Sequence, residues 1–270
     1  MAKKMNGWKS VFLGSDGHAG HYAGLCPPPW HFKPKGSRPM IAALQRELWG
    51  FFTHEIKQYK RFDAALWVGD MIDGKGQASG STELITADRH GQCEIAEAVC
   101  RAVPTDVHRI VRGTGYHTGK EEDFEDVLAR NLGAQISDQA WVEINGLVFN
   151  LKHHLGGTST PYGDGTPIRK DMLWGDIWAE MEAQPRANVT VRGHTHRCLI
   201  VDAVGPRNTP KYGVTMPALQ AAHTKYGARR CSGIVHFGFI VAEIPPKGEC
   251  IIWKKHILTV QATKPKVERL

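Results

Sequence analysis

The sequence predicts an α/β fold built on a mixed sheet or on two stacked sheets. Three features indicate this fold. Over the first two thirds of the chain, short apolar runs typical of strands alternate with segments of helical spacing. The later apolar runs follow one another without helices between them, so we expect them to pair locally as antiparallel strands. Most early strands also run directly into a loop that carries aspartate or histidine.

The strands and helices follow from these patterns in chain order. Strands are expected at residues 9–14, 62–68, 108–112, 141–144, 147–152, 189–192, 199–204, 212–215, 233–244 and 251–259. Helices are expected at residues 41–59, 93–103, 124–132 and 171–183. Asn145-Gly146 lies between two of the strands and is a strong signal for a hairpin turn.

The composition is that of an ordinary globular protein. Apolar residues make up 41% and charged residues 23% of the 270 residues. A chain of this length can bury about three quarters of its surface, so we expect a single domain over residues 1–270. Segments near 20–40 and 74–91, rich in glycine or proline and polar residues, are expected to be loop insertions, and residues 260–270 a basic tail.

The net charge and the cysteine content indicate which partners and which cellular compartment to expect. The net charge is +7, which favours a nucleic acid or another polyanion as a partner. The six cysteines contain no C-x-x-C pair, so we expect reduced thiols rather than disulfides or a sulfur metal site. No run approaches 18 apolar residues and the N-terminus has no apolar leader, so we expect a cytoplasmic protein without a membrane partner.

Polar side chains with metal-ligand chemistry follow five of the predicted strands. Because ligands of α/β sheets gather beyond the carboxyl ends of the strands, these loops are expected to meet at one place. Aspartate and histidine without cysteine form the ligand set expected for Mn, Fe or Zn at a hydrolytic site. The side chains are Asp16, His18, Asp70, His117, His153, His154, His194 and His196.

Taken in order, these segments resemble the motifs of the calcineurin-like metallophosphoesterases. Each motif is weak alone, but all five occur in the family's order between about residues 10 and 200. The resemblance implies a four-layer α/β/β/α sandwich of two mixed sheets, with a dimetal site at the C-terminal ends of the strands. The matching segments are Asp16-Gly17-His18, Gly69-Asp70-Met71-Ile72-Asp73, Gly113-Thr114-Gly115-Tyr116-His117, His153-His154 and Gly193-His194-Thr195-His196.

The resemblance also implies a role for each of these side chains. Asp16, His18 and His196 would bind a first divalent metal ion, and His153 and His194 a second, with His154 as the alternative to His153. Asp70 would bridge the two ions, which are Mn, Fe or Zn, with manganese among the candidates. A hydroxide bridging the metals would attack phosphorus. His117 would lie beside the leaving group and stabilise its charge or act as general acid.

The third motif departs from the family pattern. The usual sequence is G-N-H followed by an acid, and the asparagine there is a ligand of the second metal. In this chain Thr114 stands at the asparagine position and two further residues precede His117. The Thr114 oxygen could bind the metal, a water could replace it, or His117 itself could bend in. Thr114 is therefore a candidate ligand with these alternatives open.

The expected activity is hydrolysis of a phosphodiester or phosphomonoester, with a nucleotide or nucleic acid as one substrate class. The chain lacks the arginine and the acid that the phosphoprotein phosphatases of the family carry, which argues against a phosphoprotein substrate. His90 and Arg229 are candidate substrate contacts, and a solvated polar loop is the alternative for each. The competing function is a catalytically impaired module that binds nucleic acid or another partner. The sequence carries no indication of oligomeric state.

Overall fold

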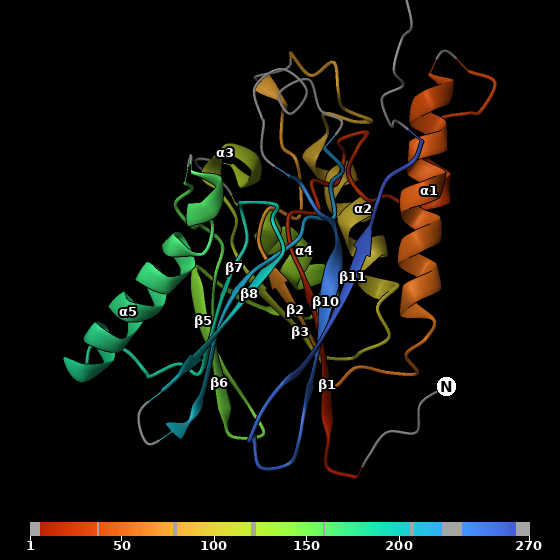
Figure 1. The fold of residues 1–270 in the computed structure, drawn as a ribbon. Coiled ribbons are helices and arrows are strands. Elements are labelled where there is room, and N and C mark those ends of the chain that lie inside the picture. Colours follow the sequence, from red (N-terminus) through yellow and green to blue (C-terminus); the bar gives the residue numbers. More distant parts are fainter. Residues whose placement is uncertain are drawn as a thin grey trace, which may run out of the picture.

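The computed structural model describes residues 6–36, 38–77, 80–119, 123–158, 160–205, 208–222 and 234–262. Eleven strands of this part form two facing sheets with helices on both outer sides (Figure 1). The first sheet has the order β11 (Ile252–Leu258), β10 (Phe237–Ile244), β1 (Lys9–Gly14), β2 (Ala64–Val68), β3 (His108–Val111) and β4 (Gln135–Ser137). The second has the order β5 (Gln139–Ile144), β6 (Leu147–Lys152), β7 (Val189–Arg192), β9 (Pro210–Thr215) and β8 (Leu199–Val204).

Side-chain alternation along the strands produces two separate layers of core. In β1, Val11 and Leu13 point into the space between the sheets, whereas Phe12 points to the opposite face. In β2 the same alternation places Leu66 between the sheets and Trp67 on the opposite face. Strands buried on both faces are therefore almost continuously apolar, as parallel strands covered on both sides must be.

Helices cover the outer face of each sheet. The core on the outer face of the first sheet includes residues of α1 (Pro39–Ile56), α2 (Arg89–Arg101) and α4 (Glu125–Leu132). On the second sheet, α5 (Thr166–Glu180) packs through Ile168 and Met172. A one-turn helix, α3 (Gly115–Thr118), lies between β3 and α4. The four-layer α/β/β/α sandwich of two mixed sheets is confirmed (Figure 1).

Several details differ from the sequence prediction. The closing strands pair as two antiparallel hairpins in different sheets, and β9 also pairs in parallel with β7. The three residues of β4 were missed because so short a run has no readable alternation. The helix α2 begins at Arg89 rather than at Cys93, because the Asp88 side chain caps it. The helix α5 begins five residues earlier than expected, with a proline in its first turn.

No helix in the described ranges has both the length and the apolar character to cross a membrane. The cysteines of the described residues are free thiols, as expected: Cys26, Cys93, Cys100, Cys198 and Cys250.

Candidate metal centre

The five motif loops converge because the strands before them run in parallel within each sheet. β1, β2 and β3 are parallel neighbours in the first sheet, and β6 and β7 in the second. Their carboxyl ends therefore lie at the same edge of the sandwich. Backbone hydrogen bonds join adjacent loops: the amide of Asp16 donates to Gly69 O at 2.9 Å, and that of Gly193 donates to His153 O at 2.9 Å.

The candidate ligands have an uncommon backbone conformation. Nine non-glycine residues in the described ranges have positive φ, and five of them are motif residues. Each such residue costs on the order of 1–3 kcal/mol and persists only where its surroundings enforce it. The chain therefore turns sharply at the strand ends, which points the side chains inward. The five are Asp16 (φ 52°), His18 (43°), Asp70 (52°), His194 (67°) and His196 (54°).

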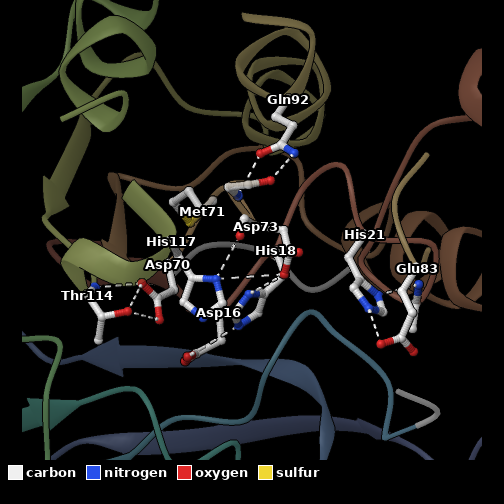
Figure 2. A network of polar contacts seen from close by, with 12 residues as sticks. Asp16, His18, His21, Asp70, Met71, Asp73, Glu83, Gln92, Thr114 and His117 are labelled. Atoms are coloured by element: carbon white, nitrogen blue, oxygen red, sulfur yellow. Dashed lines mark hydrogen bonds and ion pairs between the residues drawn. The ribbon is translucent and has the colours of Figure 1, made fainter. Parts of the chain in front are cut away.

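Asp16, His18 and His196 form the first ligand group, with their ligand atoms within 4.8 Å of one another. His18 Nδ1 lies 3.1 Å from Asp73 Oδ1 and can donate to it, which leaves the lone pair on Nε2 (Figure 2). That Nε2 is 3.3 Å from His196 Nε2, which in turn is 3.2 Å from Asp16 Oδ1. Two imidazole nitrogens and a carboxylate oxygen therefore face a common point, as ligands of a metal ion do.

Asp70, His153 and His194 form the second group. His153 Nδ1 donates to Val68 O at 2.6 Å, so Nε2 carries the lone pair of the neutral ring. This Nε2 is buried, with Asp70 Oδ2 2.9 Å away and Asp16 Oδ1 3.9 Å away. A buried lone pair facing two carboxylates is unfavourable without a proton or cation between them. The residues therefore fit a divalent metal ion.

His117 belongs to a third group with His18 and Asp70. Its Nδ1 lies 2.8 Å from the Asp73 carbonyl and donates to it, and its ring centroid is 4.5 Å from that of His18 (Figure 2). Nε2 is the nitrogen left for a substrate or a metal ion. The structure thus brings His117 to the site and leaves both of its predicted roles open.

Thr114 contacts the carboxylate of Asp70 (Figure 2). Its amide donates to Asp70 Oδ1 at 2.6 Å, and its hydroxyl lies 3.2 Å from both carboxylate oxygens. The hydroxyl has one proton to give, so it holds Asp70 in place as a donor. In this structure Thr114 positions the shared carboxylate, and its predicted role as a metal ligand stays a prediction.

The pKa shifts reflect competition between burial and opposite charge. Burial alone would raise the pKa of Asp70, but contact with His153 outweighs it and lowers the pKa to about 2. Burial would lower the pKa of His153, but its contact with the Asp70 and Asp16 carboxylates raises it to about 10. Burial and the neighbouring His18 lower the pKa of His117. The Asp70 carboxylate is therefore anionic at neutral pH and favours a cation beside it.

Sequence analysis did not identify Glu125. This fully buried carboxyl group accepts from the Met71 amide at 2.6 Å and from the Gly113 amide at 2.7 Å. It therefore ties the second motif loop to the third. Burial and the nearby Asp70 raise its pKa to about 8. No local pattern marks Glu125, because its two partners lie 12 and 54 residues away in the chain.

Two further candidates belong to none of the ligand groups, and a third lies outside the described residues. His154 is exposed, and its ring centroid is 4.8 Å from that of His194. His90 lies in the first turn of α2 and packs its ring against Phe124, so its expected position in a loop was wrong. The predicted substrate contact of His90 stays a prediction. Arg229 lies outside the described residues.

Metal binding is expected to release a proton from His153. At pH 7.5 the metal-free protein holds this proton, because the pKa is about 10, and a bound metal ion must displace it. Apparent metal affinity should therefore rise with pH up to about 10, at most roughly tenfold per pH unit for each proton released. Calorimetric titration with Zn²⁺ in buffers of different ionisation enthalpy measures the protons released.

The neighbouring exposed histidine supplies the control for this titration. His154→Ala should release as many protons as the unmodified protein, whereas His153→Ala should release about one fewer. Metal binding at pH 7.5 without proton release would contradict the role of His153.

Comparisons with known proteins found similarity in overall structure only. No family model and no curated protein sequence matches the chain. Among solved structures, wild-type Vps29 of Entamoeba histolytica complexed with Zn²⁺ is 11% identical, with a TM-score of 0.40 over 92% of this chain and 98% of that one. A novel archaeal phosphodiesterase is 11% identical, with a TM-score of 0.41 over 92% of this chain and 99% of that chain. A metallophosphoesterase of Sphaerobacter thermophilus is 11% identical, with a TM-score of 0.40 over 92% of this chain and 87% of that chain.

The architecture and the position of the ligand groups agree with the motifs read from the sequence. Two facing mixed sheets lie between outer layers of helices, and the five motif loops meet at the carboxyl ends of parallel strands. This four-layer architecture and this position of the ligand groups are those that the resemblance of the motifs to the calcineurin-like metallophosphoesterases implies.

Proposed function

We propose that this chain is a metal-dependent phosphoesterase that hydrolyses a phosphodiester. One observation supports this most directly. Carboxylates and imidazole nitrogens from separate strand ends converge there, and at His153 Nε2 a buried lone pair would face the Asp70 and Asp16 carboxylates unless a proton or a cation lies between them. Structural histidines and aspartates have no need of such an arrangement, whereas a hydrolytic metal centre requires it.

Asp16, His18 and His196 would hold one divalent ion, and His153 and His194 another, with Asp70 shared between them. Such ions polarise phosphoryl oxygens and supply a water-derived nucleophile near neutral pH. Manganese, iron and zinc all suit this ligand set.

The protein's own groups would orient the substrate and move the proton. His18 is fixed by Asp73 Oδ1 and His117 by the Asp73 carbonyl, so one residue aligns two imidazoles. His117 Nε2 would donate a proton to the leaving oxygen. Because its pKa is lowered, the protonated ring is a stronger acid but is present in a smaller fraction of molecules at neutral pH.

A diester of nucleic acid or a nucleotide is the favoured substrate class. The net charge of +7 attracts polyanions. The arginine and the acid of the phosphoprotein phosphatases are absent from the second and third motifs, so the recognition expected for a phosphoprotein is missing.

A second candidate is a binding module of the same fold that has lost activity. The altered third motif favours it, because Thr114 holds Asp70 as a hydrogen-bond donor. The complete set of aspartate and histidine ligands argues against it, since binding alone would not require five of them to keep a left-handed backbone.

A direct assay distinguishes the two candidates. Protein reconstituted with Mn²⁺, Zn²⁺ or Fe²⁺ should hydrolyse bis-p-nitrophenyl phosphate faster than p-nitrophenyl phosphate. His196→Ala should lower this rate at least about 100-fold, because it removes one of three ligands of the first group. His154→Ala is the matched control and should stay within about threefold of the unmodified protein. Absence of turnover on both esters with every metal would favour the binding module.

A further inference from the structure

A pocket of about 650 Å³ lies between the loop that follows β6 and the first half of α5. We call it the α5 pocket. Its volume is within the range of about 300–1,000 Å³ that small-molecule sites in proteins have. The described residues that line it include no candidate metal ligand, so it is distinct from the metal centre. Among the lining residues are Leu155, Gly157, Thr158, Lys170, Asp171 and Trp174.

Two connections place the α5 pocket next to the metal centre. Leu155 lies two residues after His153, so their Cα atoms are at most about 7 Å apart. Asp171, also in the lining, forms an ion pair at 2.6 Å with Arg192, which lies two residues before His194. In Figure 1, α5 begins at the end of the sandwich where the motif loops meet. A substrate held at the second ligand group can therefore extend into the pocket.

The lining combines an aromatic face, a cation and hydroxyl groups. Trp174 is 50% exposed, so its indole is available to stack on a planar ring. Lys170 is exposed and has no ion pair or hydrogen bond with another described residue. The hydroxyls of Thr158 and Thr166 can each donate and accept a hydrogen bond. A nucleotide presents the matching base, polar edges and phosphates, whereas an acyl chain would leave these polar groups unmatched.

The position of His117 indicates which part of a phosphodiester the pocket receives. His117 follows β3 of the first sheet and packs against His18, and the leaving oxygen would take its proton there. The α5 pocket follows β6 of the second sheet, on the side of His153. The proposed acid and the pocket thus come from different sheets. The pocket is therefore suited to the group that stays on phosphorus, rather than to the leaving group.

We propose that the α5 pocket binds the nucleoside that stays on the phosphate when a phosphodiester is hydrolysed. The base stacks on Trp174, and Lys170 contacts the next phosphate of the same nucleotide. This inference rests on the proposed function for the position of the scissile phosphate. The pocket itself can bind a nucleotide whether or not the metal centre turns it over.

Two esters with the same leaving group test this assignment. Thymidine 5′-(p-nitrophenyl phosphate) keeps thymidine on phosphorus, whereas ethyl p-nitrophenyl phosphate keeps only an ethyl group. The metal-loaded protein should have a kcat/KM at least about tenfold higher for the thymidine ester, because stacking of one base on an aromatic ring contributes about this factor. A 3′-phosphate on the thymidine ester should raise kcat/KM further, and Lys170→Glu should remove this gain.

Two variants change the pocket in opposite ways. Trp174→Ala removes the stacking face, and Gly157→Phe fills the space. A Cβ atom at residue 157 would meet nothing within 4 Å and the residue does not have positive φ, so the larger side chain can be accommodated. Each variant should reduce the preference for the thymidine ester to about threefold or less. Trp178→Ala is the matched control, because Trp178 has similar exposure but does not line the pocket. Its rates on both esters should stay within about twofold of the unmodified protein.

Binding of thymidine 5′-monophosphate tests the pocket without diester turnover. In equilibrium dialysis the metal-loaded protein should bind it at least about fivefold more tightly than ethyl phosphate, and both pocket variants should lose this difference. Turnover of the two esters with equal kcat/KM would overturn the pocket inference and leave the proposed function in place. No turnover of either ester, together with nucleotide binding that depends on Trp174, would do the reverse. A thymidine preference that survives both pocket variants would also overturn the inference.

Discussion

Asp70→Asn is expected to lower phosphodiester hydrolysis by roughly 10³-fold while leaving the protein folded. Asp70 belongs to two of the three ligand groups, so its negative charge serves both halves of the centre. Asparagine has nearly the same shape and tolerates the left-handed conformation at φ 52°. It also retains an oxygen that can accept from the Thr114 amide. The substitution therefore removes the charge with little change of geometry.

The measurement is the rate on bis-p-nitrophenyl phosphate with saturating Mn²⁺, together with the metal content of the purified variant. Both should fall, because a neutral amide oxygen is a weak ligand between two cations. Asp106→Asn is the matched control: Asp106 is an exposed aspartate that pairs with Arg61, and the rate should not change. A rate for Asp70→Asn within tenfold of the unmodified protein would contradict a shared ligand at this position.

Gly113→Ala is expected to destabilise the protein by about 3 kcal/mol or more and to abolish activity. A Cβ atom at residue 113 would lie 2.1 Å from Asp70 Oδ1 and 2.3 Å from Asp70 N. No rotamer change relieves contact with a backbone atom. The Gly113 amide also donates to the buried Glu125, so the loop cannot move away without breaking that bond. Either the Asp70 loop or the third motif loop must shift.

Gly115→Ala, two residues along the same loop, is the matched control. A Cβ atom there would meet nothing within 4 Å, and the residue begins α3. Alanine should therefore be neutral or stabilise by up to about 1 kcal/mol. Urea unfolding of the metal-free proteins measures both variants. If the unfolding free energies of the two variants agree within about 1 kcal/mol, the contact between the Asp70 loop and the third motif loop is loose.

Side chains alternate between the two faces of a strand, so the sequence predicts which face the residues at the strand ends occupy. In β6, Phe149 and Leu151 point between the sheets, and His153 continues the same face two residues later. His154 falls on the opposite face and is exposed. The sequence left these two histidines as alternatives, although the period of two would have favoured His153. The structure places His153, and not His154, in a ligand group.

The sequence by itself determined the α/β fold class and the five loops that carry aspartate and histidine, and the resemblance of its motifs to a known family implied the sandwich of two sheets. Strand and helix periodicity is local, and parallel strands necessarily bring their carboxyl ends to one edge. Only the tertiary structure decided that Glu125 joins two motif loops, that Thr114 holds Asp70, and that a pocket lies beside α5. Contacts between residues far apart in the chain depend on how the layers pack, and no local pattern encodes them.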